Sequence, residues 1–267
     1  MDQILRTCLG DTIALAGPAF ATEPPGERNL EKPAMPVSPM EKMQPIVHQT
    51  LSARVYQDLR ELIMSGQLQP GERLTLAGMA AALGTSAMPV REAISKLAAD
   101  DALEILPNKS VRVPVMTRSR FQELVVIRLV VEGLAVETAA TRIDEAQLSR
   151  LAALEQAFCR EISLDEPDVN QIIHINKQLH FTAYAAAQMP ALSSLIEGLW
   201  LRIGPVLNLD LRNSASRRRS DQPSVTAHRA LVDALRAGDG AAARVALASD
   251  ISSAAEVILS GTGLKPG

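Results

Sequence analysis

The 267-residue sequence has few cysteines and no long uninterrupted hydrophobic run. Its two cysteines, Cys8 and Cys159, stand far apart without CxxC or Cys/His spacing, which excludes a disulfide framework and a structural zinc knuckle. We therefore expect a reducing, cytoplasmic setting. Charged residues interrupt the apolar runs well before the roughly 20 residues needed to span a bilayer, so no transmembrane helix is expected.

Aromatic residues make up only 3% of the chain, so its 47% hydrophobic content rests on Ala, Leu, Val and Ile. That composition favours helices over a β-sandwich or barrel. The chain also has no excess of basic residues, since it contains 27 Lys and Arg and 30 Asp and Glu. Residues 46–115 hold seven charges of each sign. Any nucleic-acid site must then depend on a few local charges, with weak non-specific affinity.

The first 45 residues are rich in proline, with six prolines between Thr22 and Pro45 among Glu and Lys. A segment of this composition cannot bury a core. We predict that residues 1–45 form a disordered extension.

Three short helices are expected next. Apolar residues recur at helical spacing in 51–65, and Gly66 ends that helix. A second helix is expected to begin after its N-cap, Thr75, and to end at Gly84. A third helix begins after Ser86. Two helices joined by a short turn around a glycine form a helix-turn-helix.

Two alternating segments after the third helix predict a β-hairpin. Residues 103–106 and 111–115 flank the turn 107–110. With this wing, residues 46–116 are predicted to be a winged helix-turn-helix domain that binds DNA.

The second helix of such a motif enters the major groove, where an arginine can contact guanine with two hydrogen bonds. Arg91 is the side chain there that can do so. The alternative is that the motif serves packing alone and that Arg91 pairs with Glu92. The candidate DNA contacts on the third helix and wing are Ser86, Met88, Arg91, Ser95, Lys109 and Arg112.

Three stretches of this domain, 66–74, 79–84 and 86–93, resemble the winged-helix signature of the GntR superfamily of bacterial transcription regulators. The resemblance implies that Arg91 contacts DNA and that Ser86 touches the backbone or bases. The sequence departs from the family pattern at Ala87, where arginine is common, and at Ser110, where the wing turn commonly has glycine. The missing arginine removes a contact of about 1–3 kcal/mol, so the operator sequence or affinity is expected to differ.

The rest of the chain, 117–262, is predicted to be an all-helical bundle, which makes the whole protein mainly α. It lacks a Gly-rich phosphate loop, a GxSxG motif and a Ser/His/Asp order, so we do not predict an enzyme. Six helices are expected near 118–142, 144–162, 166–188, 191–212, 224–237 and 239–260.

A set of polar residues in this region is a candidate divalent-metal site. Asn176 and His180 share one helix face, His228 belongs to another helix and Asp250 to the last. Bundles build metal sites from such residues on facing helices. On spacing alone, an Asn/His pair is more often a hydrogen-bonded surface or interior pair.

The same region resembles the FCD ligand-binding domain of the FadR branch of that superfamily. The resemblance implies that Asn176, His180 and His228 are metal ligands and places Asp250 where the family has a third histidine. A carboxylate still suits zinc, nickel or manganese, although it shifts the preference toward harder metals. Loss of the metal is the alternative.

Arg128 occupies the place of a family arginine that often meets the carboxylate of the effector. A guanidinium facing such a cavity can clamp a carboxylate. The alternative is an ion pair with Glu132, one helical turn further on.

Together these features predict a homodimeric, effector-responsive transcription regulator, by family tendency a repressor. It would bind a palindromic operator in double-stranded DNA and respond to a small organic acid. One rival is a small metal-dependent enzyme built on the bundle. Another is a ligand-binding partner protein whose winged helix-turn-helix domain has lost its affinity for DNA.

Overall fold

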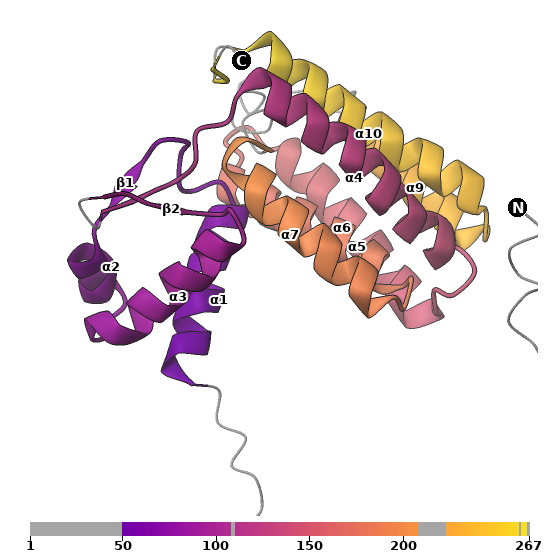
Figure 1. Cartoon of the computed structure of the whole chain (residues 1–267). Coiled ribbons are helices and arrows are strands. Elements are labelled where there is room, and N and C mark those ends of the chain that lie inside the picture. The colour runs from indigo at the N-terminus through magenta and orange to yellow at the C-terminus, as the bar shows by residue number, and fades with distance from the viewer. Residues whose placement is uncertain (1–49, 108–109, 208–222, 262, 266–267) are drawn as a thin grey trace, which may run out of the picture. The chain divides into compact units, whose positions relative to one another are not determined.

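The computed structural model of the protein describes residues 50–107, 110–207, 223–261 and 263–265. The predicted extension 1–45 and the wing residue Lys109 lie outside the described residues. The described part is mainly helical, which confirms the predicted fold class (Figure 1).

The N-terminal winged-helix domain, which we call the head, contains the three predicted helices. They are α1 (Leu51–Met64), α2 (Leu76–Ala82) and α3 (Ala87–Ala99). Thr75 caps α2 by accepting a hydrogen bond from the Gly78 amide at 3.0 Å. Gly84, in the turn between α2 and α3, has a φ of +60°, a conformation that glycine adopts without steric cost. One face of α3 is buried against α1, which leaves the opposite face exposed.

The wing is part of a three-stranded antiparallel sheet rather than a two-stranded hairpin. Strand β3 (Val111–Arg112) pairs with both β2 (Glu104–Ile105) and β1 (Arg73–Leu74). The sequence prediction missed β1 because two residues between a turn and the N-cap of α2 give no alternating pattern.

The six predicted helices of the bundle are present in the described residues. They are α4 (Arg118–Ala139), α5 (Glu145–Ile162), α6 (Val169–Ala185), α7 (Pro190–Leu207), α9 (Pro223–Arg236) and α10 (Gly240–Ser260). Helix α6 begins later than predicted because Asp168 caps it by accepting from the amides of Asn170 and Gln171. Residues 208–212 of the predicted fourth helix lie outside the described residues.

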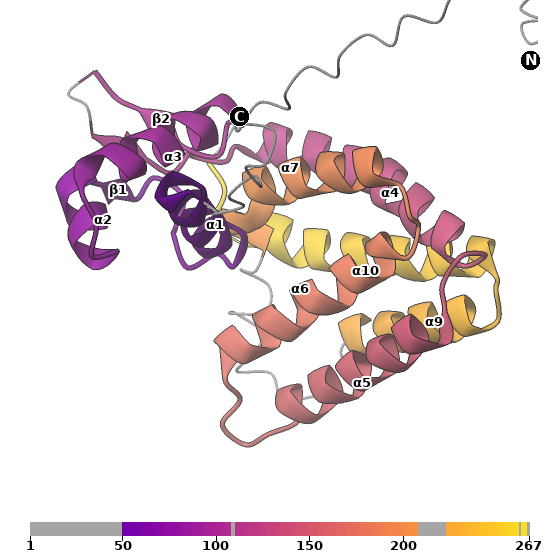
Figure 2. The ribbon, with the colours of Figure 1, turned by 90° about the horizontal axis from the view of Figure 1, so that it is seen from below.

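Figure 2 shows how the helices of the bundle are layered. Helices α4 and α7 lie along one side, α5 and α9 along the opposite side, and α6 and α10 between them. All six helices bury side chains in the interior of the bundle. No helix among the described residues is both long and apolar enough to cross a membrane.

Helix α1 of the head packs closely on α7 of the bundle. A Cβ atom added at Gly204 would lie 2.7 Å from the carbonyl oxygen of Ile63, so only glycine fits this crossing. Two ion pairs reach from α1 to the bundle: Arg60 with Glu197, at 2.5 Å, and Glu61 with Lys177.

Candidate functional site

The exposed face of α3 carries the four candidate DNA contacts of that helix. Ser86 occupies the N-cap position without making a capping bond from its side chain, and the Met88 side chain is 60% exposed. The Ser95 hydroxyl donates to the Arg91 carbonyl at 3.0 Å. Among the described residues, the Arg91 guanidinium forms no hydrogen bond or ion pair, whereas Glu92 accepts a hydrogen bond from Ser52. A cation without an internal partner on an exposed helix face is available to an external anion.

Arg112, the described candidate of the wing, is in a different situation. Its guanidinium makes two hydrogen bonds to Glu104 across the paired strands, from Nε at 2.9 Å and from Nη2 at 2.5 Å. A phosphate would therefore have to compete with Glu104 for this guanidinium. The other wing candidate, Lys109, is not among the described residues.

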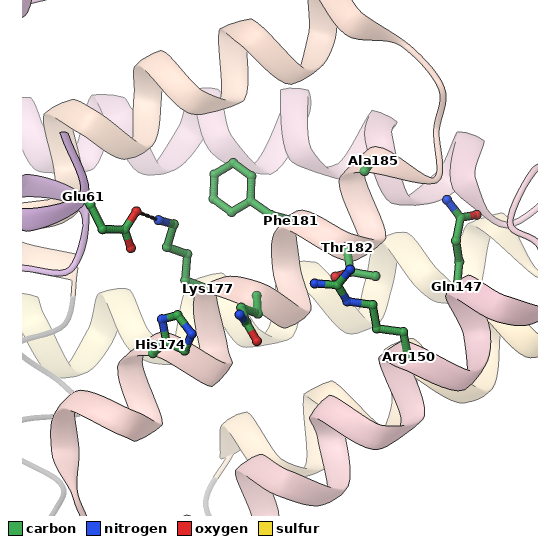
Figure 3. A pocket seen from close by; sticks show the side chains of 9 residues that line it. Glu61, Gln147, Arg150, His174, Lys177, Phe181, Thr182 and Ala185 are labelled. Atoms are coloured by element: carbon green, nitrogen blue, oxygen red, sulfur yellow. Dashed lines mark hydrogen bonds and ion pairs between the residues drawn. The ribbon is translucent and has the colours of Figure 1, made fainter. Parts of the chain in front are cut away.

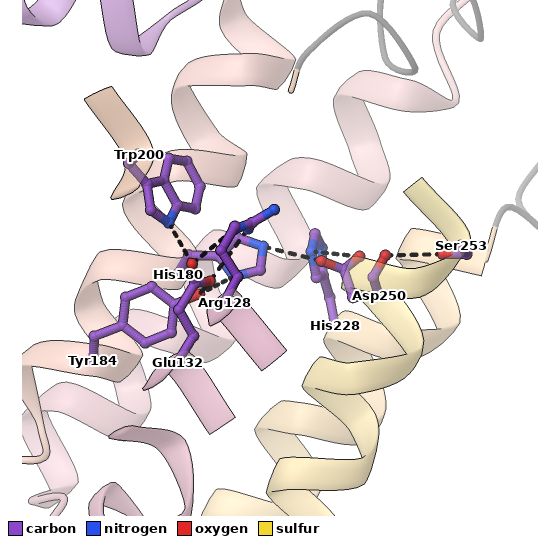
Figure 4. Close-up of polar contacts among 8 residues, drawn as sticks. All are labelled: Arg128, Glu132, His180, Tyr184, Trp200, His228, Asp250 and Ser253. Atoms are coloured by element: carbon purple, nitrogen blue, oxygen red, sulfur yellow. Dashed lines mark hydrogen bonds and ion pairs between the residues drawn. The ribbon is translucent and has the colours of Figure 1, made fainter. Parts of the chain in front are cut away.

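Three of the predicted metal ligands converge inside the bundle (Figure 4). The His180 Nε2 lies 3.2 Å from Asp250 Oδ2, and the His228 Nε2 lies 3.5 Å from Asp250 Oδ1. One ligand atom from each residue lies within 4.8 Å of the others. Asn176, one turn before His180 on α6, lines the same small cavity. Helices α6, α9 and α10 thus bring together residues up to 74 positions apart.

A fully buried carboxylate, Glu132 of α4, organises the neighbouring side chains. It accepts hydrogen bonds from Arg128 at 2.7 and 3.2 Å, from the Tyr184 hydroxyl at 2.5 Å and from the Trp200 indole at 3.1 Å. Burial disfavours the charged Arg128 guanidinium, but the Glu132 charge and hydrogen bonds outweigh it and raise the pKa of Arg128. The Arg128–Glu132 ion pair is therefore buried and joined by two hydrogen bonds.

The hydrogen bonds around Tyr184 fix the orientation of the His180 ring. Because the Tyr184 hydroxyl donates to Glu132, its oxygen must accept from His180 Nδ1, which lies 3.0 Å away. With a proton on Nδ1, the other ring nitrogen, Nε2, is directed at Asp250 Oδ2. A lone pair on Nε2 and a carboxylate oxygen do not attract each other, so this contact suits a proton or a cation between the two atoms.

His228 gives the second indication that a cation fits here. Both of its ring nitrogens are buried and have no hydrogen-bond partner within the described residues, which is costly. Burial lowers the pKa of His228 to about 4, so its ring is neutral near pH 7 and can donate a lone pair. Burial would raise the pKa of Asp250, but the two histidines and Arg128 outweigh it and lower that pKa. Two imidazoles and a carboxylate fit a divalent metal ion.

The cavity beside these residues is small. Its volume is about 20 Å³, room for about one water molecule or ion. Arg128 lines this cavity while it remains paired with Glu132. An organic acid would therefore fit only if the surrounding helices moved apart.

Sequence reasoning missed the roles of three residues around this centre. It considered Glu132 only as a partner of Arg128, and it did not single out Tyr184 or Trp200. A charged pair within the apolar stretch 124–136 is a signal of a buried ion pair, and Tyr184 follows His180 by one helical turn on the same face. The contact of Trp200 has no comparable signal in the sequence.

A winged helix followed by an all-helical domain with a buried polar centre defines a transcription regulator with separate DNA-binding and effector domains. Residues 51–113 match the bacterial regulatory proteins of the gntR family, and residues 123–253 match the FCD domain. The chain belongs to the gntR family and is a DNA-binding transcription regulator with an FCD effector domain. Its domains and relatives are those of regulators, so the metalloenzyme alternative is set aside.

The similarity to individual relatives extends over both domains. The HTH-type transcriptional regulator McbR of Escherichia coli K12 is 33% identical over 161 residues, 60% of this chain and 72% of McbR. The "Probable D-xylose utilization operon transcriptional repressor" of Paenarthrobacter nicotinovorans is 28% identical over 76% of this chain and 86% of the relative. The match to the solved structure of E. coli McbR/YncC covers 79% of this chain and 98% of the McbR/YncC chain, with a TM-score of 0.71 and 28% identity.

Proposed function

We propose that the protein is a homodimeric, cytoplasmic repressor that releases a palindromic operator when a small organic acid binds its FCD domain. The head contributes the recognition surface and the bundle the effector site. The observation that carries the proposal is the polar centre of His180, His228 and Asp250 in a bundle attached to a gntR-type head. The repressor assignment is supported by the name of the P. nicotinovorans relative.

DNA recognition would rest on α3. Arg91 would contact a guanine through both of its terminal nitrogens, while Ser86 and Ser95 would reach the backbone or neighbouring bases and Met88 a thymine methyl. Lys109 and Arg112 would contact the flanking backbone from the wing. Since Ala87 offers no donor, base readout would depend on Arg91 more heavily than in relatives with a second arginine.

The metal centre would be held by Asn176, His180, His228 and Asp250. Bound zinc, nickel or manganese would supply a positive charge that attracts a carboxylate of the effector. The protein's own part is to keep the His228 ring neutral and to aim His180 through Tyr184. Glu132 holds the Arg128 guanidinium beside the same cavity.

The effector would change the conformation of the bundle when it binds. Because the cavity holds about one water molecule, a carboxylate reaching Arg128 requires the bundle to open and has to share the guanidinium with Glu132. A ligand that binds only an open state shifts the population toward that state. Helix α7 contributes Trp200 to the polar centre and packs on α1 of the head, so opening can alter the freedom of the head.

The exposed face of α4 is the surface we assign to the dimer contact. Three large apolar side chains recur on it at one per helical turn, each 44–62% exposed: Val126, Val130 and Leu134. A row of this kind on an exposed helix marks a protein contact.

The charges flanking this row suit a second copy of the chain. Ion pairs lie at its two ends: Arg120 with Glu123, and Glu137 with Arg244. Glu123 and Glu137 are each seven residues, about 10 Å, from Val130. In an antiparallel two-fold contact centred on Val130, each ion pair would face the other pair of the partner, so arginines could meet glutamates across the interface.

Operator binding by an Arg91→Ala variant tests this assignment. We expect the wild-type protein to bind DNA from upstream of its own gene in a fluorescence anisotropy titration, and the variant to bind about 5- to 150-fold more weakly. Arg236→Ala, which removes an exposed arginine of α9, serves as the control and should bind like wild type. Equal affinity of Arg91→Ala and wild type would remove α3 as the recognition helix.

A further inference from the structure

A second, larger cavity lies between α5 and α6 beside Glu61 of α1 (Figure 3). It shares no described lining residue with the small cavity at the metal centre. Its volume is about 480 Å³, within the usual range of small-molecule pockets. Three side chains carry its chemistry: Arg150 of α5, and Lys177 and Phe181 of α6. We propose that this cavity is a binding site for a small organic oxyanion, a carboxylate or a phosphate ester with an aromatic or other apolar body.

The charges of the lining select an anion. Arg150 forms no hydrogen bond or ion pair with any described residue, and Lys177 has one ion pair, with Glu61 of α1. Glu61 is the only acid among the described lining residues, whereas Gln147 and Thr182 add neutral hydrogen-bond donors. An incoming oxyanion would therefore find a free guanidinium and an ammonium that it shares with a half-exposed carboxylate.

The apolar part of the ligand would lie against Phe181. The Lys177 ammonium is 6.0 Å from the centre of that ring, so the cationic and the apolar surfaces adjoin. The ring packs edge to face against Trp200 and Tyr184, with 5.0 Å and 5.8 Å between the ring centres. Phe181 thus gives the cavity a rigid apolar wall whose far side contacts the aromatic residues of the polar centre.

The Lys177–Glu61 ion pair gives the site a distinctive consequence. Because Lys177 pairs with a residue of the head helix α1, an oxyanion and Glu61 compete for the same ammonium. Removal of the Glu61 charge should strengthen ligand binding, and removal of the Lys177 charge should weaken it. Opposite effects of the two partners of one ion pair are not expected from a general loss of stability.

Calorimetric titration of the full chain tests the proposal, with benzoate and phenyl phosphate as probes. The protein is first freed of metal with EDTA and then dialysed, so that neither bound metal nor the chelator contributes. We expect saturable binding of at least one probe, and the stronger one identifies the oxyanion as carboxylate or phosphate. Inorganic phosphate, which has no apolar body, should bind more weakly than phenyl phosphate.

The variants locate the binding site. Lys177→Gln and Arg150→Gln should each weaken binding about tenfold or more, and Glu61→Gln should strengthen it a few-fold. Arg160→Gln, another exposed arginine of α5, and His228→Ala at the metal centre should bind like wild type. Circular dichroism verifies that each variant is folded.

Three results would overturn the proposal. One is the absence of saturable binding for both probes. Another is binding that His228→Ala loses and Lys177→Gln retains, which would place the probe in the polar centre. The third is equal weakening by Arg150→Gln and Arg160→Gln, which would reduce the effect to the overall charge of the surface.

Discussion

The recognition face of α3 and the polar centre of the bundle hold their functional side chains in opposite environments. On α3, Arg91 is exposed and unpaired among the described residues, and the helix is held by its other, apolar face. In the bundle, Arg128, Glu132 and His180 are at most 3% exposed, and each is hydrogen bonded. A change on α3 should therefore alter binding alone, whereas a change in the polar centre should alter binding and stability together.

The largest effect is expected when Glu132 loses its charge. A Glu132→Gln variant leaves the buried Arg128 cation without its counter-ion, which should lower the free energy of unfolding by about 3–5 kcal/mol. Urea denaturation measures this loss. The control is Asp233→Asn, whose ion pair with Arg236 is exposed on both sides and should cost at most about 1 kcal/mol. Similar losses in the two variants would contradict the contrast between the environments.

Metal removal should have the next largest effect. At a free metal concentration one hundred times its dissociation constant, the bound ion adds about 2.7 kcal/mol to the free energy of unfolding. Chelation with EDTA should remove that contribution from wild-type protein and from Arg91→Ala, and should leave His228→Ala unchanged. If neither metal nor EDTA changes the free energy of unfolding of the wild-type protein, the proposed metal centre is contradicted.

Tyr184 offers a smaller change that tests the hydrogen bonds behind His180. Tyr184→Phe removes the acceptor of the His180 Nδ1 proton, and loss of such a supporting bond typically weakens metal binding about 10- to 100-fold. A competition titration with a chelating dye measures the affinity. Tyr56→Phe alters the other tyrosine of the chain, which bonds to Asp100 in the head, and should keep the wild-type affinity. Equal affinities in all three proteins would mean that Tyr184 does not orient the ligand.

The smallest effect is expected for Arg112 in the wing. Because Glu104 already pairs with its guanidinium, Arg112→Ala should weaken operator binding less than Arg91→Ala does and by a similar factor for every DNA sequence. It should also reduce the slope of log affinity against log salt by about 1. Anisotropy titrations at several salt concentrations measure both quantities. Loss of specificity at a single base pair would instead show that Arg112 reads a base.

The two regions also differ in how far the sequence predicts them. The helices of the head follow from apolar spacing and caps such as Thr75, and Arg91 could be placed on the exposed face of α3 from spacing alone. Strand β1 could not, because its two residues gain their pairing from β3, more than 35 residues away. The spacing of Asn176 and His180 indicates a shared helix face, but the hydrogen bonds that Tyr184 and Trp200 donate to Glu132 depend on how three helices pack.

The most direct test of the central claim is the metal content of the purified protein, measured by mass spectrometry after EDTA treatment, reloading and removal of free metal. The account predicts one ion per chain in wild type and in Arg91→Ala, and none in His180→Ala or His228→Ala variants that remain folded. The same metal content in all four proteins would contradict it.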